Sequence, residues 1–94
     1  MLNIKKNFDE EKNLWNVALE GEIDIYTSSN LKENLNEIIE ERLEDILFDC
    51  EGLEYIDSTG LGVLIGTLKK LKVKDKNIII KSPRDNILKL LKIT

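Results

Sequence analysis

The sequence of 94 residues has no histidine, one cysteine and one proline, and aromatic side chains make up only 5% of it. Without histidine there are no imidazole bases, no Ser-His-Asp triads and no histidine-containing metal sites. The single cysteine, Cys50, can form neither an internal disulfide nor a multi-cysteine metal site, which fits a reducing compartment such as the cytoplasm. The composition therefore predicts no metal and no cofactor.

Long hydrophobic runs are also missing. The N-terminal stretch MLNIKKNFDEEKN has no apolar signal region, and no apolar run approaches the roughly 18 residues that cross a bilayer. The length fits one domain over residues 1–94, and an apolar share of 41% is enough for one core. A chain this small has little room for a deep active site, so we expect a binding protein rather than an enzyme.

Charge is distributed unevenly along the chain, whose net charge is −4. Residues 1–65 carry 16 acids and 5 bases, whereas residues 66–94 carry 2 acids and 9 bases. The basic third contains no arginine-rich or aromatic-interleaved stretch, and the isoelectric point is about 4.9. These features exclude nucleic acid as the expected partner and favour lysines on solvated helix faces.

Apolar spacing predicts a single α/β domain with the element order β-β-α-β-α-β-α and a mostly parallel sheet of about four strands. Ile46 to Phe48 form a short apolar run typical of a strand buried on both faces, which we expect to end at a buried Cys50. The run from Asn77 to Lys81 predicts another buried strand. The remaining expected elements are two strands around Leu2–Ile4 and Trp15–Leu19 and helices that begin near Thr27–Asn30, after Asp57 and at Ser82-Pro83.

One segment at a predicted strand-to-helix junction combines polar and small residues: Asp57-Ser58-Thr59-Gly60-Leu61-Gly62. The first N–H groups of a helix have no partner within it, and the helix dipole makes this end mildly positive, so the junction favours an anion or a phosphoryl group. A purely structural interpretation is also consistent with the residues, and composition alone favours it. In that interpretation Asp57 or Ser58 caps the helix, and the glycines allow close packing on the sheet.

Common catalytic and nucleotide-binding motifs do not match this segment. Gly60, Gly62 and Gly66 are spaced one residue too far for a dinucleotide fingerprint, and no lysine follows as in a phosphate-binding P-loop. Ser58 has no histidine base and no Ser-x-x-Lys spacing, which argues against a hydrolase. A small nucleotide-binding or GTP-hydrolysing domain that uses residues 57–62 stays open as an alternative.

Two motifs resemble the STAS-domain family of anti-sigma factor antagonists. These are Gly21-Glu22-Ile23-Asp24 before a helix, and the run from Tyr55 to Leu64, YIDSTGLGVL, after a strand. The resemblance implies that Ser58 is phosphorylated, with Thr59 as the alternative acceptor. It also implies a partner-binding surface made of Asp24, Asp57, Ser58, Thr59, Gly60, Leu61 and Gly62.

The same resemblance implies that this chain acts as a binding switch and catalyses no reaction itself. The unphosphorylated form would bind an anti-sigma factor serine kinase, which supplies ATP and magnesium, and so release a sigma factor. Phosphorylation of Ser58 would end the binding, and a serine phosphatase would reset it. The alternative within the family is a non-phosphorylated scaffold in a signalling or transporter-regulating complex.

The sequence departs from the family at its end. Family members continue past the segment that matches residues 90–94 with a further strand and helix. The resemblance therefore predicts a bare sheet edge here, and a monomer or weak dimer.

Overall fold

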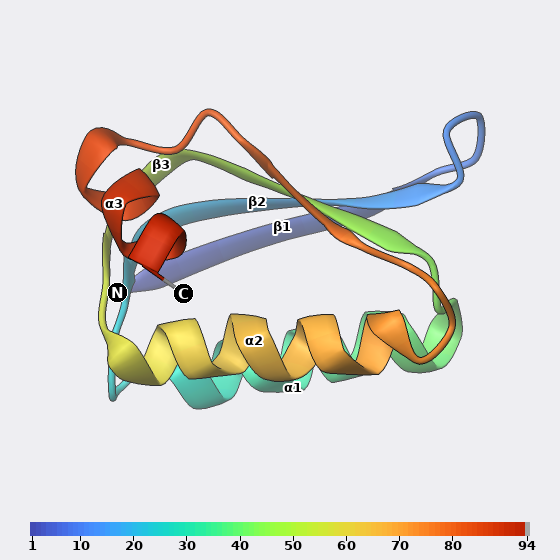
Figure 1. The fold of residues 1–94 in the computed structure, drawn as a ribbon, viewed down its shortest axis with the longest axis horizontal. Coiled ribbons are helices and arrows are strands. Elements are labelled where there is room, and N and C mark those ends of the chain that lie inside the picture. The colour runs from blue at the N-terminus through green and yellow to red at the C-terminus, as the bar shows by residue number, and fades with distance from the viewer. Residues whose placement is uncertain (94) are drawn as a thin grey trace.

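The computed structural model describes residues 1–93, with side chains to residue 92, and contains the seven elements in the predicted order (Figure 1). The chain folds as a single α/β unit with three helices and four strands. The elements are β1 (Leu2–Asp9), β2 (Leu14–Ile23), α1 (Ser28–Glu41), β3 (Asp45–Ile56), α2 (Ser58–Lys72), β4 (Ile78–Lys81) and α3 (Asp85–Ile93). None of the helices in the described part of the chain is long and apolar enough to cross a membrane.

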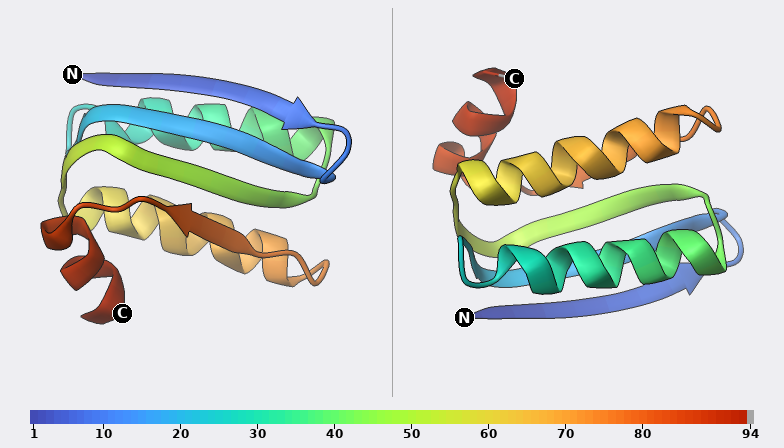
Figure 2. Two further views of the ribbon diagram at one scale, coloured as in Figure 1. Left: turned by 90° about the horizontal axis from the view of Figure 1, so that it is seen from above. Right: turned by 90° about the horizontal axis from the view of Figure 1, so that it is seen from below.

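The four strands form one mixed sheet in the order β1-β2-β3-β4. β1 and β2 are antiparallel, as expected of two strands joined by a short turn, and β2, β3 and β4 are parallel to one another. The helices α1 and α2 are the crossovers between the parallel strands. Both lie side by side against one face of the sheet, and α3 lies beside the β4 edge (Figure 2).

The core lies between the sheet and the pair α1 and α2. Apolar residues at helical spacing on both helices meet alternate residues of β2 and β3, which explains why a short chain can bury a continuous core. The central members are Val17, Leu19, Leu31, Leu35, Ile46, Phe48, Leu64 and Leu71, each at most 7% exposed.

The prediction that β3 ends at Cys50 is wrong, because the strand continues to Ile56. Cys50 is buried as expected, but the stretch after it, expected to be a loop, pairs with the end of β2. The pairing register shifts between Ala18 and Glu20 and again between Gly21 and Glu22. Each shift places an extra residue in β3, so the alternation of apolar residues that marks a strand is lost from the sequence.

The strands are also less buried than predicted. Ile46 and Phe48 are fully buried, but Leu47 between them is only partly buried because the helix pair covers a single face of the sheet. β4 is an edge strand rather than a buried one, and Ile79 is 42% exposed. The last helix begins at Asp85, after the predicted start at Ser82-Pro83, because Ser82 has a left-handed backbone with φ of 54°.

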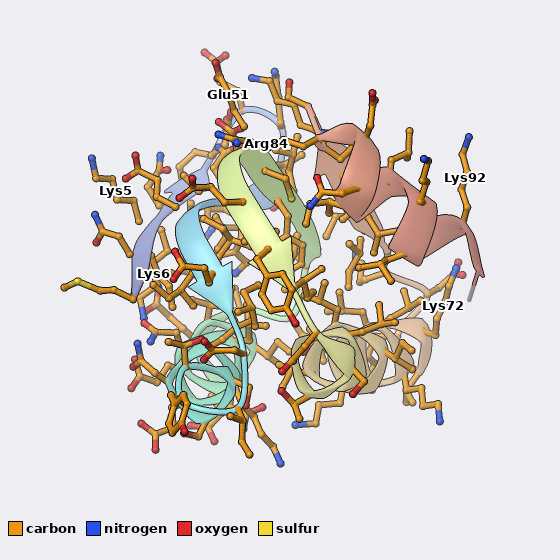
Figure 3. The ribbon with its side chains drawn as sticks, turned by 90° about the vertical axis from the view of Figure 1, so that its left-hand side faces the viewer. Lys5, Lys6, Glu51, Lys72, Arg84 and Lys92 are labelled. Atoms are coloured by element: carbon orange, nitrogen blue, oxygen red, sulfur yellow. The ribbon has the colours of Figure 1, made fainter. Side chains whose placement is uncertain are left out.

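The parallel strands β2 and β3 end at the same edge of the sheet, and each leads into a helix. The backbone N–H of Asp57 donates to the carbonyl oxygen of Ile23 at 3.0 Å and joins the two strand ends. The β2–α1 and β3–α2 connections therefore lie together at one end of the long axis, at the left of Figure 1. Figure 3 looks onto this end, with α1 and α2 seen along their axes.

Candidate functional site

Ser58 is the first residue of α2 and lies at this end of the domain with an exposed side chain. Within residues 1–93, no group forms a hydrogen bond with its hydroxyl. An accessible hydroxyl without a partner is what an enzyme that modifies Ser58 would need.

Asp57 caps α2. Its backbone is extended, with φ of −104° and ψ of −173°, and its Oδ1 accepts the backbone N–H groups of Thr59 and Gly60, each at 3.0 Å. The same oxygen accepts the Thr59 hydroxyl at 2.5 Å. These hydrogen bonds, with that of the Thr59 hydroxyl the strongest, hold the pKa of Asp57 below its ordinary value. Asp57 is therefore ionised at neutral pH and binds two of the free amides of the helix.

The hydroxyl groups of Ser58 and Thr59 thus differ in their hydrogen bonding. The Thr59 hydroxyl donates to Asp57, whereas the exposed Ser58 hydroxyl makes no hydrogen bond within the described residues. The sequence left open whether Asp57 or Ser58 caps the helix. The geometry assigns the cap to Asp57 and its side-chain contact to Thr59, not Ser58.

The two glycines of the segment have different surroundings. A Cβ on Gly60 would lie 2.4 Å from Cγ2 of Ile23 and 2.9 Å from Cγ1 of Ile56, so Gly60 is buried and lets α2 approach the strand ends. A Cβ on Gly62 would meet nothing within 4 Å, so Gly62 faces open space. The sequence suggested that both glycines allow close packing of the helix on the sheet, and this holds for Gly60 only.

Leu61 and Gly62 face two different hollows beside α2. Leu61 lines an apolar hollow of about 390 Å³ between α2, β4 and α3. Gly62 and Thr59 line another of about 330 Å³ between α1 and α2. The residues predicted for one partner-binding surface thus spread around the first turn of α2 rather than over one flat patch.

Asp24 follows β2 and lies at the same sheet edge as Asp57. Its Oδ1 accepts the backbone N–H groups of Tyr26 at 2.9 Å and Thr27 at 3.1 Å. The Thr27 hydroxyl in turn donates to the carbonyl oxygen of Glu22 at 2.9 Å. Thr27 is the N-cap of α1 but makes no side-chain cap bond, contrary to the expected capping by residues 27–30. Asp24 instead fixes the turn that starts α1.

Sequence reasoning missed three large exposed side chains at this end of the domain: Ile25, Tyr26 and Tyr55. Ile25 and Tyr26 follow Asp24, and Tyr55 comes two residues before Asp57. A signal was available, because Ile25 and Tyr26 are apolar residues that lie directly before the predicted helix start at Thr27–Asn30.

The charges at this end are mainly acidic. Glu22, Asp24, Glu54 and Asp57 all lie at or beside the ends of β2 and β3. The N-terminal amine of Met1 lies 3.2 Å from Oε1 of Glu22 and pairs with it. No group of three or more side chains in the described part of the chain is arranged to hold a metal ion.

Comparison with known proteins gives a consistent set of relatives. The sequence profile of the STAS domain matches residues 5–94. The chain is 36% identical over 93 residues to the anti-sigma-B factor antagonist of Staphylococcus aureus, covering 99% of this chain and 86% of that protein. It is 39% identical over 80 residues to the same-named protein of Staphylococcus epidermidis, covering 85% of this chain and 74% of that protein.

Solved structures share the fold at low sequence identity. The unphosphorylated anti-sigma factor antagonist SpoIIAA superposes with a TM-score of 0.81 at 18% identity, covering 98% of this chain and 84% of that one. The phosphorylated form of the Bacillus protein SpoIIAA gives 0.79 at 18% identity, covering 97% and 82%. An anti-sigma factor antagonist from Mycobacterium paratuberculosis gives 0.78 at 19% identity, covering 98% and 78%.

Proposed function

Because the chain belongs to the STAS domain family, we propose that it is an anti-sigma factor antagonist whose binding is switched by phosphorylation of Ser58. Its unphosphorylated form binds an anti-sigma factor that is also a serine kinase, and the binding releases a sigma factor. The observation that carries the proposal is the exposed hydroxyl of Ser58 at the start of α2, next to a Thr59 hydroxyl that Asp57 already binds. This difference favours Ser58 over Thr59 as the acceptor.

In this proposal the chain is a substrate rather than a catalyst. The Ser58 Oγ attacks the γ-phosphorus of ATP held with magnesium by the kinase, the bond from that phosphorus to the β–γ bridging oxygen breaks, and ADP leaves. The hydroxyl proton passes to a base of the kinase. A serine phosphatase restores the hydroxyl by hydrolysis. We place this cycle in the cytoplasm, where sigma factors act.

Phosphorylation should leave the fold intact. A phosphate adds about −1.5 to −2 charge at pH 7. It sits at the positive end of α2, which favours a negative charge by about 0.3 to 1 kcal/mol. Asp57 already accepts the N–H groups of Thr59 and Gly60, so those amides are not free to enclose the phosphate. The phosphate therefore projects into solvent, next to the Asp57 carboxylate.

The same charge opposes docking of the kinase. A kinase in contact with Ser58 holds nucleotide phosphates next to it, so the phosphate of the product meets charge of its own sign. Burying such an uncompensated charge costs on the order of 2 to 5 kcal/mol, or about 30-fold to several thousand-fold in affinity. The partner-binding surface we propose comprises Asp24, Asp57, Ser58, Thr59, Leu61 and Gly62, with Gly60 packed beneath them.

Two substitutions of Ser58 that differ only in charge test this proposal. The affinity for the host's anti-sigma factor is measured with wild type, with Ser58→Glu and with Ser58→Gln, whose side chain has the shape of Glu without its charge. Release of the sigma factor is measured in the same samples. We expect Ser58→Glu to weaken binding at least about 30-fold and Ser58→Gln to weaken it much less. Equal affinities of the Glu and Gln variants would show that charge at Ser58 is not the switch.

A further inference from the structure

Ile25, Tyr26 and Tyr55, which we call the Tyr26 patch, expose large apolar side chains at the end of the domain that carries Ser58. Tyr26 is 87% exposed, Ile25 67% and Tyr55 49%. A single exposed apolar side chain is ordinary in a folded protein, but several at one place are typical of an interaction surface. Both tyrosines of the chain belong to this patch.

The patch is assembled by the same contacts that form the site. Tyr55 pairs in register with Glu22 on the neighbouring strand, and Ile23, the last residue of β2, is joined to Asp57 at 3.0 Å. Ile25 and Tyr26 follow directly from this point. Both segments of the patch therefore lie at the strand ends that face the viewer in Figure 3.

The backbone of the patch is fixed while its side chains are free. Asp24 accepts the backbone N–H of Tyr26 at 2.9 Å, so the turn is held before any partner arrives. A tyrosine ring on a fixed backbone loses little conformational entropy on binding and buries a large area, which is why tyrosine is enriched among the residues that dominate binding energy.

The dimensions of the domain show whether a partner that binds at Ser58 also contacts the Tyr26 patch. A standard protein interface buries about 800 Å² on each partner, which for a circular patch is roughly 30 Å across. The domain measures 30 × 23 × 23 Å, and Ser58 lies at one end of its long axis (Figure 1). An interface of ordinary size centred on Ser58 is thus wider than this end and includes the β2–α1 turn and the end of β3.

We propose that the Tyr26 patch is the docking surface by which the serine kinase holds this chain while it phosphorylates Ser58, an inference that rests on the proposed function. The kinase presents an apolar depression for the Tyr26 ring beside its nucleotide site. The acidic residues Asp24 and Glu54 directly precede the two segments of the patch, so basic side chains of the kinase lie at the rim, outside the nucleotide site. The patch then provides most of the affinity for the kinase, and the phosphate on Ser58 weakens that binding.

The test compares Tyr26→Ala, Tyr26→Phe and Val73→Ala in binding to the host's anti-sigma factor kinase with ADP and magnesium, and in phosphorylation with ATP. Val73 is the matched control, because it is 80% exposed and lies after α2, away from Ser58. Circular dichroism and thermal unfolding verify the fold of each variant. We expect Tyr26→Ala to raise Kd at least about 10-fold and to raise KM with kcat within about 2-fold. Tyr26→Phe and Val73→Ala should stay within about 3-fold of wild type.

The outcomes separate this inference from the proposed function. If Tyr26→Ala binds and is phosphorylated like wild type while Ser58→Glu still weakens binding, the docking patch is wrong and the switch stands. If Tyr26→Ala and Val73→Ala weaken binding equally, the patch has no specific role and the inference fails. If the kinase phosphorylates Ser58→Ala as well as wild type, the proposed function itself fails, whatever Tyr26→Ala does.

Discussion

The carboxylate of Asp57 accepts the hydroxyl of Thr59 at 2.5 Å, on the same oxygen that caps the amides of α2. The neighbouring Ser58 hydroxyl has no partner within the described residues and is available to an enzyme. The hydrogen bonds to Asp57 also make its charge part of the stability of the domain, which leads to a prediction about pH.

Replacing Asp57 by Asn keeps a capping oxygen but removes its charge. The folded-state pKa of Asp57 is lowered, so its contribution to stability is complete above the unfolded-state value of about 3.9 and is lost as the pH falls through the lower folded-state value. We expect Asp57→Asn to lower Tm by about 2 to 6 °C at pH 7. This difference should be constant from about pH 5 to 8 and should shrink below about pH 4.

Thermal and urea unfolding across this pH range measure the effect. Glu33→Gln, on the exposed side of α1, removes one negative charge without removing a cap and serves as the control. A difference between wild type and Asp57→Asn that persists unchanged at pH 3 would contradict the charged cap.

Two alanine substitutions on α2 should change stability in opposite directions. Gly60→Ala places a Cβ 2.4 Å from Cγ2 of Ile23, and overpacking of this kind costs about 1 to 3 kcal/mol. Gly62→Ala meets nothing within 4 Å, so it should stabilise the helix by up to about 1 kcal/mol. The free energy of unfolding in urea measures both. Equal effects of the two substitutions would mean that Gly60 is not packed against the sheet as described.

The order of elements could be predicted because it depends on local patterns. Leu31, Leu35 and Ile38 share one helical face, and the structure buries all three. The position of Ser58 at the start of a helix could also be predicted, from the change of apolar spacing after Ile56. These features depend on a few neighbouring residues and on nothing distant.

Other features depend on distant residues and could not be predicted. The two extra residues of β3 are visible only against the register of β2, so Leu53 and Ile56 did not look like part of a strand. The exposure of β4 follows from which strand occupies the edge of the sheet. The bond between Thr59 and Asp57 requires the side-chain geometry of the cap, and the sequence alone left Ser58 equally able to fill that role.

Cys50 should be unreactive in the folded protein. Burial, together with the nearby charge of Asp49, raises the pKa of its thiol from 9.0 to about 11. Two pKa units lower the thiolate fraction about 100-fold at pH 8, and burial also blocks access. Alkylation by iodoacetamide, followed by mass spectrometry, should be more than about 100-fold slower in buffer than in urea. Similar rates in the two conditions would show that the thiol is exposed.

The measurement that tests the central claim most directly is mapping of the phosphate after incubation with the host's anti-sigma factor kinase, ATP and magnesium. We predict one phosphate per chain, located on Ser58 by fragment mass spectrometry, absent from Ser58→Ala and retained in Thr59→Val. A phosphate on Thr59 in the wild-type chain, or one full phosphate on Ser58→Ala, would contradict the account.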